Sequence, residues 1–314
     1  MLNRRIIRIK VFKLLFSSVH SHKFDPEVAE KELLVSLEKT RKLYFLLLTL
    51  PDALAAYARE RIDIGLNKYH PSEEEIHPNL RFVNNRVIAL LQEDKELVHA
   101  QEHGLNWSEH RSYIKNLYEQ LKEEPYFIEY MTDPQEPGFA EDLKLMLDFY
   151  SCQLAEDPEL NTLLEDQSLY WADDVAYVCN IILTLLDGLK EGTRQIRHPE
   201  LFYNDEDKQF ALELLGHALT HYDTYVGYVE KFAENWEPER IAATDIILIV
   251  MGIAEAVAFP SIPFKVTLNE MVEISKLYST GNSRIFVNGI LDKILKYLTQ
   301  EGDIVKTGRG LVEN

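Results

Sequence analysis

The stretch FKVTLNEMVEISKLYSTGNSRIFVNGILDK, residues 264–293, decides the fold of this 314-residue chain. It predicts two amphipathic helices joined by a tight turn. Apolar residues recur at helical spacing over about 267–278, and this segment begins with a threonine followed three residues later by a glutamate, which is the capping-box pattern. Gly281 is expected to end the first helix and Ser283 to cap the second. The stretch therefore predicts a helical hairpin.

The second helix of this hairpin is expected to have one buried and one polar face. Its polar face carries Arg284, Asn288 and Asp292 at positions i, i+4 and i+8. Asparagine and aspartate are mediocre helix formers, so helix propensity does not account for them. Two interpretations stay open, a solvated face with one local ion pair or a recognition surface. The residues expected on the buried face are Val287, Ile290, Leu291, Ile294, Leu295 and Leu298.

The hairpin sequence resembles the C-terminal signature of the NusB family of transcription antitermination factors. The residues that carry the resemblance are Pro263-Phe264-Lys265-Val266, Asn269-Glu270, Glu273 and Phe286 to Lys293. The resemblance continues upstream in residues 236–255 (WEPERIAATDIILIVMGIAE), which are similar to the family's short helix and the central buried helix after it. It also includes residues 207–232, which are similar to the helix before these, and residues 4–20, which are similar to the family's Arg-rich first helix. A signature of this length is far more specific than a single glycine motif.

The resemblance implies an all-α fold, a NusB-like helical bundle with an additional helical insertion. We expect residues 1–20 to form the first helix of the bundle and residues 205–298 its C-terminal core. Residues 21–204 are expected to be a helical insertion or a rebuilt N-terminal subdomain, and residues 299–314 a flexible tail. The composition independently favours helices, since glycine and proline are sparse.

The resemblance also implies a function and a set of contacts. Members of the family bind the boxA element of ribosomal RNA leaders as single-stranded RNA, pair with NusE, a protein of the small ribosomal subunit, and join the antitermination complex of RNA polymerase on ribosomal RNA operons. The NusE surface would lie near Trp236, Arg240 and Glu255. The RNA surface would comprise Arg4, Arg5, Arg8, Phe264, Lys265, Thr280, Asn282, Arg284, Phe286, Asn288 and Asp292.

The N-terminal segment is expected to form a helix from about Arg4 to Val19. Lys10, Lys13 and Ser17 would lie on its polar side, whereas the three arginines at positions 4, 5 and 8 project from the apolar side. These arginines therefore either belong to a frayed, solvated arm or point at a partner. The expected buried arc comprises Val11, Phe12, Leu14, Leu15, Ser18 and Val19.

The distribution of charge bears on nucleic-acid binding more than its sum, a net charge of −19. Residues 1–24 hold six Lys/Arg and no acid, residues 92–174 hold 21 acids against five bases, and residues 264–314 hold seven bases against six acids. A basic N-terminal segment and a near-neutral hairpin are therefore able to share one RNA surface, while the acidic middle faces elsewhere.

Other classes of protein find little support in the sequence. There is no phosphate-binding glycine loop, dinucleotide fingerprint or nucleophile elbow, so we expect no enzyme and no cofactor. The histidine pairs 99/103 and 217/221 lack a nearby third ligand, so we expect no metal. The apolar runs at 43–50 and 246–254 are too short to cross a membrane, and two widely separated cysteines fit a reducing cytoplasm.

Two further alternatives concern the resemblance itself. The alternative function is a protein–protein scaffold of the same fold that has lost RNA binding, in which the acidic insertion has replaced that binding or binds another basic protein. Phe264 and Phe286 would either stack on bases or belong to the core.

Overall fold

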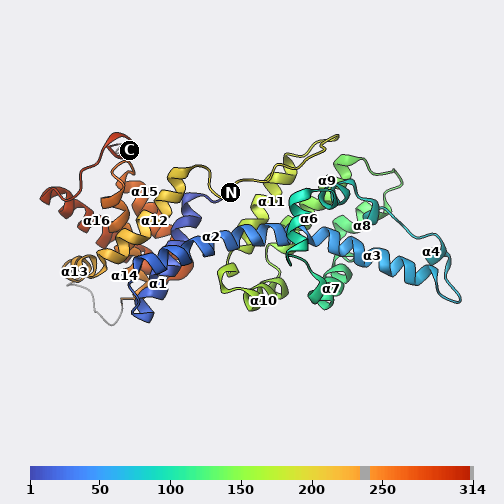
Figure 1. Ribbon diagram of the computed structural model, residues 1–314, viewed down its shortest axis with the longest axis horizontal. Coiled ribbons are helices and arrows are strands. Elements are labelled where there is room, and N and C mark those ends of the chain that lie inside the picture. Colours follow the sequence, from blue (N-terminus) through green and yellow to red (C-terminus); the bar gives the residue numbers. More distant parts are fainter. Residues whose placement is uncertain (234–240, 312–314) are drawn as a thin grey trace. The chain divides into compact units, whose positions relative to one another are not determined.

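The computed structural model describes residues 1–233 and 241–311, and this part of the chain is helical without a β-strand (Figure 1). The all-α prediction is confirmed. The chain divides into two compact units, residues 1–37 with 200–314 (the core unit) and residues 38–199 (the inserted unit). The predicted boundaries at 20/21 and 204/205 differ from these, chiefly because the first part of α2 (Pro26–Leu48) belongs to the core unit.

The core unit is organised around helix α14 (Ala243–Ala258). Residues 247–251 and 253–256 of this helix are fully buried, so it is covered on all sides, as its nearly uninterrupted apolar sequence requires. Helix α14 packs against α1 (Arg4–Ser21), α12 (Asp205–Thr220), α13 (Tyr222–Phe232), α15 (Phe264–Tyr278) and α16 (Ser283–Glu301).

One glycine sets how closely α14 and α16 approach each other. A Cβ atom at Gly252 would lie 2.5 Å from Leu291 Cδ2 and 3.1 Å from Met271 Cγ, so no larger residue fits without movement. The six apolar residues predicted on the buried face of α16 are all buried, Val287 and Leu291 among them. The hairpin of α15 and α16 is therefore confirmed.

The boundaries of α15 differ from the prediction. The helix begins at Phe264 after Pro263, which supplies extended backbone at the N-cap, and Thr267 lies inside the helix. The Thr267 hydroxyl is buried and donates to Glu255 instead of capping, so the capping-box prediction was wrong. The prediction that Ser283 caps α16 was wrong, because Asn282 is at the N-cap and Ser283 is the first residue of the helix.

Both ends of the core unit are attached to it. At the N-terminus, Leu2 is fully buried and its backbone N–H donates to the carbonyl of Leu201 at 2.9 Å. After α16 ends at an αL glycine, Ile304 is buried and Thr307 N–H donates to the carbonyl of Pro260 at 3.1 Å. Over the described part of the segment 299–314, the structure thus differs from the expected flexible tail: residues up to 301 continue the helix, and Ile304 and Thr307 attach the stretch after it to the core unit.

The inserted unit contains short helices in addition to the second half of α2. They are α3 (Leu50–Leu66), α4 (Glu73–Ile76), α5 (Arg86–Gln92), α6 (Lys95–Glu102), α7 (Arg111–Leu121), α8 (Pro125–Thr132), α9 (Phe139–Asp148), α10 (Pro158–Gln167) and α11 (Val175–Asp187). Two of its buried polar groups bond to the backbone of α2: the Trp107 indole donates to the carbonyl of Leu46 at 3.1 Å, and the Tyr150 hydroxyl donates to that of Leu47 at 2.9 Å. No helix in the described ranges 1–233 and 241–311 is long and apolar enough to cross a membrane.

Candidate nucleic-acid interface

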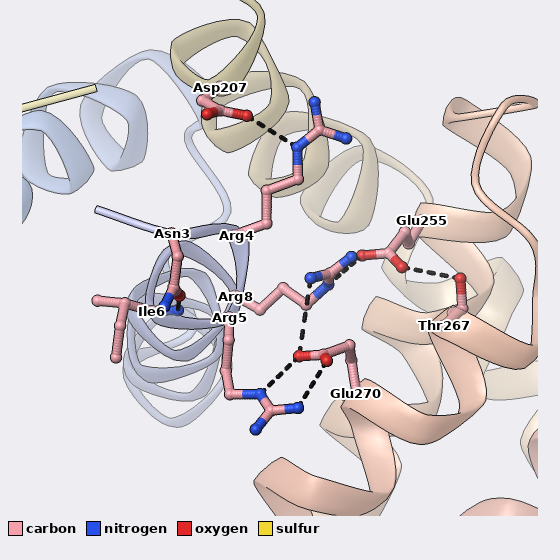
Figure 2. A network of polar contacts seen from close by, with 9 residues as sticks. All are labelled: Asn3, Arg4, Arg5, Ile6, Arg8, Asp207, Glu255, Thr267 and Glu270. Carbon is pink, nitrogen blue, oxygen red and sulfur yellow. Dashed lines mark hydrogen bonds and ion pairs between the residues drawn. The ribbon is translucent and has the colours of Figure 1, made fainter. Parts of the chain in front are cut away.

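The arginines at the start of α1 are held by carboxylates of the same unit (Figure 2). Arg4 Nε lies 2.8 Å from Asp207 Oδ1 on α12. Arg5 makes two hydrogen bonds to Glu270 on α15, of 2.7 and 2.9 Å. Asn3 caps the helix through its side chain, which accepts from Ile6 N–H at 3.0 Å. The arginine end of α1 is therefore a fixed helix terminus and not a frayed arm.

Arg8 is part of a buried network that joins three helices. Its side chain is only 3% exposed, and Arg8 Nε lies 2.5 Å from Glu255 Oε2 on α14. The other oxygen of Glu255 accepts from the Thr267 hydroxyl on α15 at 2.8 Å, and Arg8 Nη1 lies 3.8 Å from Glu270 Oε2 (Figure 2). A buried carboxylate needs this pairing because desolvation of a lone charge is costly.

Burial of Arg8 and Glu255 bears on two predicted contacts. With both side chains inside the core unit, neither presents its charged group to solvent in this structure. Their roles as RNA and NusE contacts stay predictions that would require this network to open. The other two predicted NusE contacts, Trp236 and Arg240, lie outside the described residues.

The polar side of α1 also differs from the helical-wheel expectation. Lys10 is buried, whereas Lys13 is half-buried with its ammonium 5.5 Å from the ring centre of Tyr278. The prediction that Lys10 lies on a solvated face was wrong, because α1 is covered by neighbouring elements on more than one side. On the predicted buried arc, residues 11, 12, 14 and 15 are buried and residues 18 and 19 are half-buried.

The pKa values of Arg5 and Glu270 are shifted chiefly by the hydrogen bonds between them. The hydrogen bond to Glu270 raises the pKa of Arg5 above its usual value. The same bond, assisted by the nearby charge of Arg8, holds the pKa of the Glu270 carboxyl below its usual range. Both groups are charged at neutral pH, so an RNA phosphate that approaches Arg5 competes with Glu270.

The turn between α15 and α16 is fixed by a network of hydroxyl groups. The Ser279 hydroxyl donates to Asp245 Oδ1 at 2.6 Å and lies 2.8 Å from the hydroxyl of Thr244. Ser283 Oγ accepts from Thr280 N–H at 3.1 Å and is 2.9 Å from Ser279 Oγ. Asp245, at the start of α14, is buried, so this carboxylate anchors the turn to the central helix.

The anchored turn presents polar groups to solvent. Thr280 and Asn282 are exposed at its tip, and Arg284 and Asn288 are exposed on the first turns of α16. Asp292, farther along the same face, is half-buried and forms an ion pair of 2.7 Å with Lys296. The predicted polar stripe is thus accessible, and its last member carries the local ion pair that a solvated face would also have.

The aromatic candidates have different positions. Phe286 is 4% exposed and belongs to the core, so it has no free face for a base. Phe264 is half-buried, and the Lys306 ammonium lies 4.8 Å from its ring centre. Lys265, beside Phe264 in the first turn of α15, is exposed.

Two groups of predicted RNA contacts lie at opposite ends of α15. Helix α1 runs alongside α15 in the same direction, because Arg5 pairs with Glu270 and the ring of Phe12 lies 5.3 Å from that of Tyr278. Arg5 and the first turn of α15 thus form one group, and the anchored turn after α15 forms the other. A 15-residue helix is about 22 Å long, and the exposed side of α16 bridges this span.

Sequence reasoning missed three residues of this interface. Asp245, Ser279 and Lys13 support or flank the turn, but none was predicted to belong to the interface. The signal available was the run of small hydroxyl residues around Gly281, which is typical of side-chain-stabilised turns. The described residues contain no group of three or more metal-ligating side chains that could hold an ion.

Comparison with known proteins assigns this chain to a family. The model of the NusB family matches residues 182–296, a segment that includes α12 to α15 and most of α16. A transcription antitermination protein NusB from Salinibacter ruber (strain DSM 13855 / M31) is 43% identical over 111 residues, which cover 34% of this chain and 69% of the relative. The chain belongs to the NusB family.

Two further NusB proteins show the same partial overlap. That of Chloroherpeton thalassium (strain ATCC 35110 / GB-78) is 38% identical over 106 residues, which cover 34% of this chain and 50% of the relative. That of Thermodesulfovibrio yellowstonii (strain ATCC 51303 / DSM 11347 / YP87) is 40% identical over 93 residues, which cover 30% of this chain and 62% of the relative. The chain therefore spans between half and about two-thirds of these NusB proteins, and it is longer than they are. No solved structure matches the chain.

Proposed function

We propose that this protein is a non-catalytic, RNA-binding transcription antitermination factor. It binds boxA-type single-stranded RNA together with NusE and thereby promotes transcription of ribosomal RNA operons within the RNA polymerase antitermination complex. Membership of the NusB family supports the general role, since the matched relatives are transcription antitermination proteins. The observation that carries the RNA contact is the exposed stripe of Arg284 and Asn288 beside a turn anchored by Asp245.

The chemistry of this stripe suits unpaired bases. Single-stranded RNA is read through hydrogen bonds to exposed base edges, and its backbone is held by cations. Asn288, Asn282 and Thr280 supply uncharged donors and acceptors, while Arg284 and Lys265 supply positive charge. Because the turn is fixed before RNA arrives, little conformational entropy is lost when these groups bind.

Arg4, Arg5 and Arg8 have different roles in this proposal. Arg5 is nearly half exposed, so its guanidinium is able to exchange Glu270 for a phosphate. Arg4 is partly exposed beside Asp207 and acts in the same way. Arg8 is a positioning residue that fixes α1 against α14 and α15.

The test is RNA affinity over a salt series with matched variants. We expect Arg284→Ala and Lys265→Ala to weaken binding of a boxA-type RNA and each to reduce the slope of log K against log salt by about 0.7 to 1, the loss of one phosphate contact. Lys31→Ala, which removes an exposed lysine on α2, is the control and should change neither quantity. Equal slopes for all four proteins would reject the proposed RNA surface.

A protein-only scaffold is the second candidate, and one observation favours it. The N-terminal arginines already pair with Asp207, Glu255 and Glu270 of the same chain, so their charge is partly satisfied without RNA. If the folded protein bound NusE but showed no salt-dependent RNA affinity, this second function would replace the first.

A further inference from the structure

A groove lies at the end of the core unit away from the turn. It is bounded by the first turn of α15, the last turns of α16 and residues 302–311, and its cavity volume is about 870 Å³. This is within the range of pockets that bind sizeable ligands, roughly 300–1,000 Å³. Its apolar lining comprises Phe264, Leu268, Leu295, Ile304, Val305 and Leu311.

The segment after α16 builds one wall of this groove. Lys306 Nζ donates to the carbonyls of Ala256 at 2.8 Å and Phe259 at 3.2 Å, at the C-terminal end of α14. Ile304 is buried beneath it. This wall lies beyond residue 296, where the NusB family match ends, so the groove is not supplied by the matched segment alone.

The wall leaves two large apolar side chains open to solvent. Val305 is 68% exposed and Leu311 is 67% exposed, and both line the groove. Single exposed apolar residues are ordinary, but two of them lining one apolar groove enlarge the apolar surface that a partner could cover.

The rim of the groove is positively charged. Lys265, Lys296 and Lys306 line it, and the acidic residue among the lining side chains, Asp292, is already paired with Lys296 at 2.7 Å. Burial lowers the pKa of Lys306 to about 8, so this amine keeps its charge at neutral pH. An occupant with acidic groups beside its apolar face would complement this rim.

The lining favours a peptide over a nucleobase. Bases bind single-strand sites mainly by stacking on aromatic rings. The aromatic ring of the groove belongs to Phe264 and is covered by the Lys306 ammonium, while the other apolar residues are aliphatic. Aliphatic side chains spaced along a helix fit such a floor.

We propose that the groove between α15, α16 and residues 302–311 binds an acidic, amphipathic helical segment of a partner protein. Leucine-like side chains of the segment would pack against Leu295, Val305 and Leu311, and its flanking carboxylates would face Lys265 and Lys296. This contact overlaps the predicted RNA surface at one edge, formed by Phe264, Lys265 and Asp292, and it excludes Arg284 and Asn288 of the stripe on α16.

The probe for this proposal is a pair of fluorescent 18-residue helical peptides titrated with the full-length protein. Both carry leucine at i, i+3, i+4 and i+7, and they differ in having glutamate or lysine at every flanking position. We expect the acidic peptide to bind at least tenfold more tightly than the basic one. Leu311→Glu and Val305→Glu should each weaken binding of the acidic peptide at least tenfold, because each places a negative charge on the apolar lining that faces the peptide.

Leu277→Glu is the matched control, since Leu277 is also 67% exposed but lies on α15 outside the groove. It should leave the affinity unchanged, and circular dichroism of all three variants should match the wild type. Failure of the acidic peptide to bind at 1 mM would overturn the proposal, as would equal binding to Leu311→Glu. Self-association of the protein that Leu311→Glu abolishes would assign the groove to a second copy instead, and loss of RNA affinity in this variant would assign it to RNA.

Discussion

Removal of the Arg8 side chain is the sharpest perturbation of the core unit. Arg8 is 3% exposed and Glu255 is fully buried, so Arg8→Met removes the guanidinium that pairs with a buried carboxylate, which keeps its hydrogen bond from the Thr267 hydroxyl. Breaking a buried ion pair on one side costs about 3–5 kcal/mol. Methionine retains much of the aliphatic stem, so the loss reports on charge more than on packing.

A double-mutant cycle separates the pair from its surroundings. Glu255→Leu should also destabilise the protein, but Arg8→Met combined with Glu255→Leu should recover most of the loss, because no unpaired charge then remains. Arg5→Met is the control: it breaks an exposed pair with Glu270 and should cost at most about 1 kcal/mol.

The assay must report on the core unit, and two of the three tryptophans, Trp107 and Trp171, lie in the inserted unit. Native-state hydrogen exchange of the α14 amides, combined with urea unfolding, measures the local free energy directly. A loss below about 1 kcal/mol, or a double mutant no better than Arg8→Met, would refute this account of the network.

Three further predictions concern charge and pH. Arg284→Glu should weaken RNA binding at least tenfold more than Arg284→Ala does, measured by fluorescence anisotropy, because repulsion adds to the lost contact. The pKa of Glu270 is lowered in the folded state, so its pairing with Arg5 stabilises the protein above about pH 4.5. This stabilisation is lost as the pH falls through the pKa that Glu270 has in the folded state. In acid-titrated urea melts, Arg5→Met should therefore lose less stability than the wild type between pH 5 and pH 3. Burial, and to a lesser extent the neighbouring His221, lower the pKa of His217 below 6.5, so on acidification the His217 imidazole is protonated in the unfolded state before it is protonated in the folded state. NMR titration should find this lowered pKa of His217 in the wild type and a partial return toward 6.5 in His221→Ala.

Local patterns predicted the α15–α16 hairpin and the exposure of its polar stripe. The apolar spacing of α16 distinguishes Val287 and Ile290, which are buried, from Arg284 and Asn288, which are exposed. Periodicity works here because α16 has one covered side and one open side.

The same reasoning failed where long-range contacts decide. Thr267 matched a local cap pattern, but its hydroxyl bonds to Glu255, a buried acceptor on another helix. Lys10 is buried although its helical wheel position is polar. A pairing such as Arg8 with Glu255, 247 residues apart, leaves no mark in local spacing. Long-range pairing is therefore the part of the site that sequence reasoning left out.

We propose that this NusB-family protein binds single-stranded RNA as an adaptor together with NusE. The most direct measurement is the affinity of the full-length chain for a boxA-type RNA with and without NusE, in the wild type and in Arg284→Ala. The account predicts binding that strengthens when NusE is added, weakens with salt, and falls in the variant both with and without NusE. Absence of RNA binding by the folded wild type in either condition would contradict it and leave a protein-only scaffold.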